Sequence, residues 1–302
     1  MTTRARRVAR LCSAAGALLV CLALIPPAFA HEAIDRQIAD LDARIAAHPR
    51  EASLYLMRGE LHRVHADREA AARDYRRARE IAPGLDAVDL CFGRLHLDGG
   101  DPARAIKSLD RFLQGHPEHP DALAIRARAL ARLGRNLDAA HDLTQAIEAR
   151  RPTGLPDPEL FLERARLLAE APEPRIEDAL RGLDEGRRTL GPVVGLEFYA
   201  IDLETRLGRF DAALQRLDRL AALSPRKESY LVRRASIFEA AARPDEARRA
   251  YEEALAAIAA LPPERRGARA VHDLETTARS GLARLVVPAG PAGSPAPRGE
   301  TR

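Results

Sequence analysis

The stretch GELHRVHADREAAARDYRRAREIAP, residues 59–83, carries the pattern that decides the fold. Its small residue Gly59 precedes a polar turn, and the second half places Ala71 and Tyr75 on one side of a helix before Pro83 ends the run. Residues three and four positions apart are neighbours on an α-helix. The stretch therefore predicts two antiparallel helices, with small residues where the helices cross and larger apolar residues filling the gaps.

The same pattern returns along the chain with a regular spacing. The small position of the second helix is occupied by Ala71, Ala105, Ala139, Ala179, Ala213 and Ala247. The separations are 34 residues, except for one of 40 residues between Ala139 and Ala179. Pro-rich segments in this longer interval, RRPTGLPDPE and EAPEPR, absorb the six extra residues. We expect them to form loops that protrude between the third and fourth units, because the apolar pattern resumes at once.

This pattern resembles the tetratricopeptide repeat (TPR) family, whose 34-residue motif combines a Leu-Gly pair, a Tyr, an Ala, an aromatic residue and a Pro. The matching residues are Tyr55, Gly59, Ala71, Tyr75, Ala78 and Pro83 in the first copy, Gly93, Ala105 and Pro117 in the second, and Ala127, Ala139 and Ala146 in the third. The resemblance implies an all-α solenoid of about six helix-turn-helix units over residues 51–262. We expect these units at about 52–85, 86–119, 120–157, 158–193, 194–227 and 228–262.

Both ends of the repeat array are expected to be capped, because a solenoid must cover the exposed apolar face of its end units. Residues 31–50 contain only the second helix of a unit and are interpreted as an N-terminal capping half-repeat. Residues 263–287 are interpreted as a C-terminal capping helix. Residues 288–302 contain too few apolar side chains to fold and are expected to form a disordered Pro/Gly-rich tail.

The first thirty residues have the features of a secretory signal peptide. A basic start is followed by an apolar run from Leu11 to Ile25, and small residues before His31 predict cleavage after Ala30. The resemblance is thus to an exported TPR protein of a Gram-negative bacterium, periplasmic or secreted; a retained membrane anchor is the alternative. The chain has 48 basic and 44 acidic residues, and the leader carries four of the arginines, so the mature chain is formally neutral. This balance argues against nucleic-acid binding.

An arginine row is the candidate binding feature. In the TPR family, the residue after the small position of the first helix faces the concave groove, and the resemblance places Arg94, Arg128 and Arg166 there. Residues one turn earlier would supply an apolar floor: Leu56, Leu90, Ala124, Leu162 and Val232. Arginine can hold a carboxylate through two hydrogen bonds, so the row predicts binding of a peptide with acidic groups or a free C-terminus. The alternative is that the arginines pair with neighbouring acids of the chain.

The sequence contains no motif that predicts catalysis: it lacks a Gly-rich phosphate loop, a Gly-x-Ser-x-Gly elbow and a His-Glu-x-x-His helix. We therefore expect a non-catalytic scaffold without cofactors. Its partner would be another exported or envelope-associated protein, with no nucleic acid and no membrane span after signal cleavage. Two alternatives stay open: a metal-handling protein that uses His31, His62 and His65, or a helical accessory subunit of an envelope enzyme. Cys91, inside a helix, is expected to be an inert apolar residue.

Overall fold

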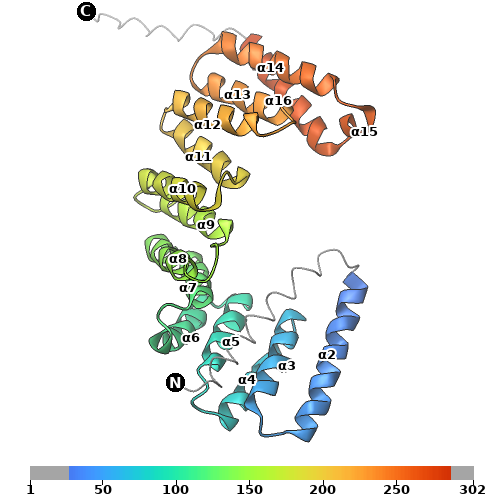
Figure 1. Cartoon of the computed structure of the whole chain (residues 1–302), viewed down its shortest axis with the longest axis vertical. Helices are drawn as coiled ribbons and strands as arrows, with labels where there is room; N and C mark the ends of the chain where they lie inside the picture. The colour runs from blue at the N-terminus through green and yellow to red at the C-terminus, as the bar shows by residue number, and fades with distance from the viewer. Residues whose placement is uncertain (1–26, 287–302) are drawn as a thin grey trace, which may run out of the picture. The chain divides into compact units, whose positions relative to one another are not determined.

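The computed structural model describes residues 27–286, and in this range the chain is entirely helical, with no strand (Figure 1). Its fifteen helices are α2 (Pro27–Ala47), α3 (Ala52–Val64), α4 (Arg68–Ile81), α5 (Ala87–Asp98), α6 (Pro102–Gly115), α7 (Pro120–Arg132), α8 (Asn136–Arg150), α9 (Pro158–Ala169), α10 (Ile176–Leu190), α11 (Val194–Arg206), α12 (Phe210–Ala222), α13 (Glu228–Ala240), α14 (Pro244–Ala259), α15 (Pro263–Arg266) and α16 (Arg269–Val286). The predicted all-α class is confirmed.

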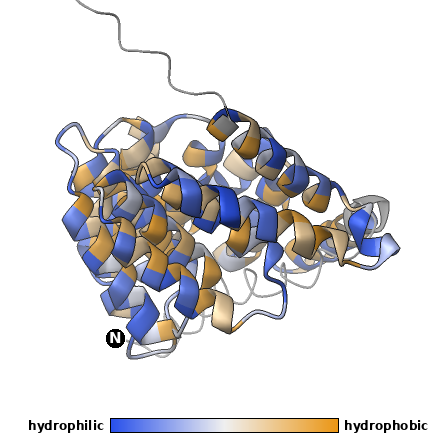
Figure 2. Ribbon diagram, turned by 90° about the horizontal axis from the view of Figure 1, so that it is seen from above, coloured by the Kyte–Doolittle hydropathy of each residue, from blue (hydrophilic) through white to orange (hydrophobic). Residues whose placement is uncertain are grey.

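The helices form antiparallel hairpins, and the chain divides into two compact units, at residues 27–179 and 180–286 of the described part. In the first unit each helix from α2 to α8 packs on the helix that follows it, so that the series ends with α8 on α9. In the second unit α11 packs on α12, α12 on α13, and α13 on α14, with α16 lying against α14 and α13. Figure 2 shows hydrophilic and hydrophobic residues alternating along the helices, as expected where each helix buries one side.

The small positions allow the close helix crossings that the sequence predicts. A methyl group added to Gly59 of α3 would lie 2.5 Å from Cε1 of Tyr75 in α4. A methyl group on Gly93 of α5 would lie 2.6 Å from Cγ of Leu109 in α6. Tyr75 and Leu109 are fully buried, so each large side chain fills the space that the glycine opposite leaves open.

The turns within the first two hairpins each combine one residue of positive φ with a side-chain helix cap. Gly100 has φ +78°, and the next residue, Asp101, accepts a hydrogen bond from the backbone N–H of Arg104 at the start of α6 (2.9 Å). The first hairpin has the same design with Ala66, at φ +63°, before the capping residue Asp67. Aspartate is among the preferred residues at this cap, because its carboxylate satisfies an N–H that has no partner within the helix.

Ion pairs around two arginines connect neighbouring helices of the first unit, and the sequence pattern did not predict them. Arg58 of α3 donates from Nε to Asp74 of α4 (2.9 Å) and from Nη1 to Asp42 of α2 (2.5 Å). Two hairpins later, Arg126 of α7 repeats the arrangement, with Asp142 of α8 at 2.7 Å and with Asp110 of α6 at 2.8 Å. Each arginine therefore ties its own hairpin to the helix before it.

In the second unit the same position carries the opposite charge. Arg216 lies three residues after Ala213, as Asp74 lies three after Ala71. Its side chain is only 7% exposed and is surrounded by acids, donating to Glu204 (2.8 Å) and Glu197 (3.1 Å) of α11 and to Asp184 of α10 (2.9 Å). The first, third and fifth repeats thus carry a charged interhelical contact at this position, and the helix that supplies the cation changes between them.

The two ends of the described chain add helices to the repeat hairpins. α2 covers α3, and Leu41 and Ile45 of α2 are buried there. The residues predicted to form one C-terminal capping helix are divided into α15 and α16, which are separated at Gly267, the residue that caps α15. The predicted leader and tail lie outside the described residues, apart from residues 27–30 at the start of α2. In the described range no helix has the length and apolarity needed to cross a membrane.

Candidate functional site

The predicted arginine row lies on α5, α7 and α9, but every member of it faces an acid of the same chain. Arg94 pairs with Glu60 of α3, with 3.3 Å between Nη1 and Oε2. Arg128 pairs with Glu163 of α9, with 2.9 Å between Nη2 and Oε1. Arg166 lies 3.6 Å from Glu159, which is two turns earlier on α9. The structure therefore distributes the row among separate ion pairs and does not bring the three arginines together.

The junction between α3 and α5 is closed by a network around Glu60. Its carboxylate accepts hydrogen bonds from the Tyr75 hydroxyl and from Arg63 and Arg94, and Arg63 reaches on to Asp98 of α5 (2.5 Å). Burial alone would raise the pKa of Glu60, but the charges of Arg63 and Arg94 and the Tyr75 hydroxyl outweigh it, so this pKa lies below its ordinary value of 4.5. Two acids and two arginines thus neutralise each other here.

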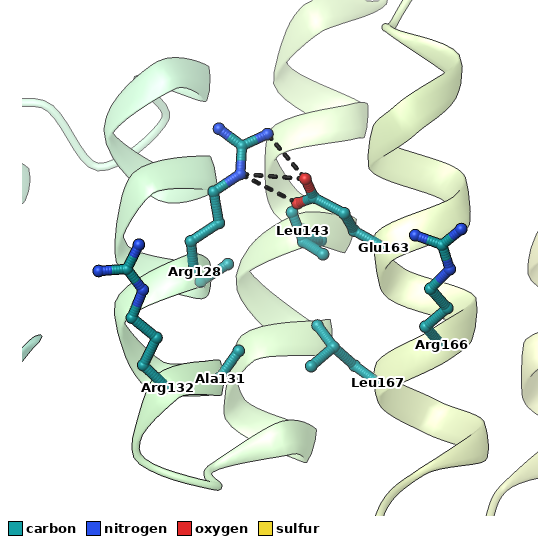
Figure 3. Close-up of a pocket in the computed structure, with 8 residues that line it drawn as sticks. Arg128, Ala131, Arg132, Leu143, Glu163, Arg166 and Leu167 are labelled. Atoms are coloured by element: carbon teal, nitrogen blue, oxygen red, sulfur yellow. Dashed lines mark hydrogen bonds and ion pairs between the residues drawn. The ribbon is translucent and has the colours of Figure 1, made fainter. Parts of the chain in front are cut away.

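A pocket of about 330 Å³ lies between α7 and α9, over α8 (Figure 3). Its lining residues are Ala127, Arg128, Ala131, Arg132, Leu143, Glu163, Arg166 and Leu167. The apolar members come from all three helices, and the charged members come from α7 and α9. In Figure 3 the Arg128–Glu163 pair spans the space between the two helices, with Arg132 on the α7 side and Arg166 on the α9 side.

The pocket coincides with the long interval in the repeat spacing. The link from α8 to α9, residues 151–157, exceeds the links at residues 82–86 and 116–119. Along the first unit, α3 packs against α5 and α5 against α7, whereas α9 packs against α8 and makes few contacts with α7. We attribute the opening to the longer link, because it relieves α9 of the tight spacing that a 34-residue repeat imposes. This agrees with the expectation that the extra residues form loops.

Most of the charged side chains that line the pocket are arginines. Three of its lining residues are arginines and one is an acid, Glu163. Arg132 donates from Nη1 to the backbone carbonyl of Leu97 (2.5 Å), so its partner in this contact is a neutral group. The Arg166–Glu159 pair is about half exposed on both sides, and such pairs contribute little to stability. The pocket therefore combines an apolar floor with three arginines and one acid at its edge.

The other predicted groove residues lie mostly inside the hairpins. Leu56 and Leu90 are 2% and 4% exposed, so they belong to the core and offer almost no surface to a ligand. Leu162 is partly buried and is not among the residues that line the pocket. The floor is formed instead by Leu143 of α8 and Leu167 of α9. Arg132, Glu163 and these two leucines were missed by the sequence analysis.

The histidines predicted as metal ligands have separate surroundings. Nε2 of His62 lies 4.0 Å from Asp74, and Nδ1 of His65 lies 3.7 Å from Asp35 of α2. Within residues 27–286 no group of three or more His, Cys, Asp and Glu side chains is placed to hold a metal ion. The side chain of His31 lies outside the described part, so the site that combines it with His62 and His65 stays a prediction. Cys91 is fully buried, as predicted for an apolar residue.

The fold and the hairpin contacts define a protein of the α-solenoid class. Residues 92–154 and 200–262 match the sequence pattern of the tetratricopeptide repeat family. These two segments therefore carry tetratricopeptide repeats, and the helical repeat fold that the resemblance implies is confirmed.

One of the similar solved structures shows the same fold with a TM-score above 0.5. The chain is similar to the C-terminal part of a TPR repeat-containing protein from Cytophaga hutchinsonii, with 14% identity, a TM-score of 0.61, and coverage of 82% of this chain and 96% of that one. A tetratricopeptide repeat protein from Parabacteroides merdae has 17% identity, a TM-score of 0.48 and coverage of 82% and 92%. YrrB, a TPR protein with an unusual peptide-binding site, has 15% identity, a TM-score of 0.48 and coverage of 68% and 97%. No curated protein matches the chain in sequence.

Proposed function

We propose that the protein is a non-catalytic scaffold that acts in the periplasm and binds an exported or envelope-associated partner on the α3, α5, α7 and α9 side of its first unit. Tetratricopeptide repeats generally mediate protein–protein interactions. The proposal of export rests on the basic, apolar and small-residue pattern of residues 1–30. The absence of catalytic motifs in the sequence supports a binding role.

The observation that carries the proposal is the pocket between α7 and α9. Two of the three predicted binding arginines, Arg128 and Arg166, line it together with apolar side chains. An apolar floor with a few charged groups at its edge is the usual composition of a ligand site. Because the pocket is built on packed helices, binding would require little ordering of the backbone, which preserves affinity.

Capture of partners from an envelope extract tests the proposal. The bait is the protein, and the test variant carries Arg94→Glu, Arg128→Glu and Arg166→Glu. Arg248→Glu is the matched control, since Arg248 is an exposed arginine of α14 in the second unit. We expect a partner that the parent and the control hold and that the triple variant loses, with all three proteins showing the same helical circular-dichroism spectrum.

Two results would count against the proposal. A partner that the folded triple variant still holds would place the interaction outside this side of the first unit. Failure of the parent protein to hold any envelope protein would argue against a scaffold role altogether.

A further inference from the structure

We propose that the second unit docks onto an anionic phospholipid surface through one of its ends. This end, called the link end below, consists of residues 188–194, 219–228 and 260–269, where the chain passes from one hairpin to the next. The inference goes beyond the proposed scaffold function, because it concerns neither the pocket nor the first unit. It is carried by unpaired cations, by exposed apolar side chains and by the contrast with the opposite end of the same unit.

The antiparallel order of the helices brings the three segments of the link end together. α11 and α12 pack as a hairpin, so the end of α12 lies on the same side as the start of α11. α13 packs on α12 and on α14, which places its start on the side where α12 and α14 end. α15 follows α14 there, and α16 begins directly after it and runs back along α14 and α13 (Figure 1).

The link end carries six exposed basic side chains that form no ion pair with any residue that the structure describes. They are Arg188, Arg219, Arg226, Lys227, Arg265 and Arg269. A seventh cation, Arg266, donates from Nη2 to the backbone carbonyl of Leu261, which is neutral (3.0 Å). The acids of these segments are Glu264, which is exposed, and Glu228, which is buried. The link end is therefore strongly positive, although the chain after residue 30 is formally neutral.

The opposite end of the second unit has the reverse balance of charge. Its two turns, residues 204–211 and 239–246, carry five acids and three arginines. Arg243 in the second turn is paired, with Asp211 at 3.2 Å and Glu246 at 2.8 Å. The two ends of the unit thus differ in the sign of their net charge. An anionic surface would attract the link end and orient the unit towards it.

Exposed apolar side chains accompany the cations at the link end. In the described part of the second unit, the two most exposed large hydrophobic side chains are Leu223, at 68%, and Val194, at 47%. Leu223 caps the end of α12, and Val194 begins α11, so both belong to the link end. The next most exposed, Leu207 at 36%, lies at the opposite end. Cations and apolar groups therefore gather at the same end of the unit.

A phospholipid surface satisfies both features at once. Its phosphate groups attract basic side chains, and the boundary between headgroups and acyl chains accepts apolar side chains. A nucleic acid offers phosphates without an apolar layer behind them. An acidic protein would need a separate apolar pocket for each exposed side chain. The link end therefore fits a bilayer that contains anionic lipids, with Leu223 and Val194 inserted shallowly among the headgroups.

Sedimentation with lipid vesicles tests the inference. The protein is residues 31–302, the form expected after signal cleavage, because the apolar leader would itself bind lipid. This form keeps Leu41 and Ile45, the residues that α2 buries. Vesicles of phosphatidylglycerol mixed with phosphatidylcholine are compared with vesicles of phosphatidylcholine alone. We expect binding to the anionic vesicles to be at least about tenfold tighter, and to weaken as the salt concentration rises.

Charge reversal locates the binding. Arg226→Glu with Lys227→Glu should weaken binding to the anionic vesicles at least about tenfold, because both side chains would face the lipid phosphates. Arg248→Glu with Arg249→Glu is the matched control, since it makes the same change of charge on exposed arginines near the start of α14, away from the link end. The control should keep most of the affinity. The comparison of the two kinds of vesicle needs only the parent protein, so the inference stays testable if a variant fails to fold.

A fluorescent reporter separates insertion from attraction alone. An environment-sensitive dye is attached at Leu223→Cys, and the native Cys91 does not compete for it because its side chain is fully buried. The emission should shift to shorter wavelength when anionic vesicles are added, since the dye would enter an apolar layer. The same dye at Leu207→Cys, on the opposite end of the unit, should show no shift.

Three results would each overturn the phospholipid surface: equal binding to the two kinds of vesicle, equal losses from the two charge-reversed proteins, or the same emission change from positions 223 and 207. A nucleic acid or an acidic protein held through Arg226 and Lys227, without vesicle binding, would also overturn it. Capture of an envelope partner by the first unit is measured separately and with other variants. The proposed scaffold function therefore stands or falls independently of these results.

Discussion

A single repeat position carries a buried charge that joins the two helices of a hairpin. Three residues after the repeat alanine, the first and third repeats carry Asp74 and Asp142, whereas the fifth repeat carries Arg216. All three are buried and all have partners of opposite charge. Removing one partner of a buried pair is costly because the other charge is left unsatisfied, even where the intact pair adds little net stability.

Asp74→Ala should therefore destabilise the protein by about 1–3 kcal/mol, because Arg58 would keep only its exposed partner Asp42. Asp42→Ala is the matched control, since it removes the exposed partner of the same arginine and should cost less than about 1 kcal/mol. Urea denaturation followed by circular dichroism measures both changes. Equal losses from the two variants would show that the buried contact has no special weight.

The residue with positive φ in each hairpin turn affects the stability of that hairpin. Ala66 has φ +63° in a region that side chains with a Cβ avoid at a cost of roughly 1–2 kcal/mol, whereas Gly134 occupies the corresponding turn at φ +72° without that cost. The glycine loses more backbone entropy on folding, which offsets part of the advantage.

Ala66→Gly should consequently stabilise the protein by up to about 1 kcal/mol. The reverse change, Gly134→Ala, should destabilise it by about 1 kcal/mol, since nothing within 4 Å would obstruct the added methyl group and only backbone strain remains. Thermal denaturation of the two variants provides the measurement. A lower melting temperature for Ala66→Gly would contradict this account of the turns.

The contact between α3 and α5 should respond to pH through Glu60. Its pKa in the folded protein lies below the ordinary 4.5, so it binds a proton more readily in the unfolded chain. The stabilisation is therefore complete above about pH 4.5 and is lost as the pH falls through the lowered folded value. Glu60→Gln should flatten the fall in unfolding free energy below pH 4.5, whereas Glu69→Gln on an exposed side chain should not. An unchanged pH dependence in Glu60→Gln would contradict the role given to the network.

At the scale of the whole molecule, the repeat spacing predicted the fold because hairpin packing depends on positions that recur. Gly59 and Tyr75 occupy such positions, and their contact is the one that the spacing required. The arginine row was predicted less completely. Arg128 and Arg166 line a pocket, but Arg94 pairs with Glu60. This pair could not be predicted, because a spacing of 34 residues does not reveal which charges meet across a junction.

The pocket itself could not be predicted, because it depends on a departure from the repeat. Arg132 occupies a position that is Val64 in the first repeat and Asp98 in the second repeat, so no recurring residue marked it as functional. The apolar floor was assigned to residues one turn before the small position, and Leu56 and Leu90 turn inward to the core. The one signal in the sequence was the 40-residue interval, which predicted protruding loops.

The most direct test of the binding account is photo-crosslinking from the pocket in cells. A photoreactive amino acid at position 131 should form an adduct with one envelope partner, and this adduct should disappear when Arg132→Gln and Arg166→Gln are added. The same amino acid at position 248 of α14 serves as the control and should give no such adduct. An adduct that forms equally from both positions, or one from position 131 that survives loss of the two arginines, would contradict recognition at this pocket.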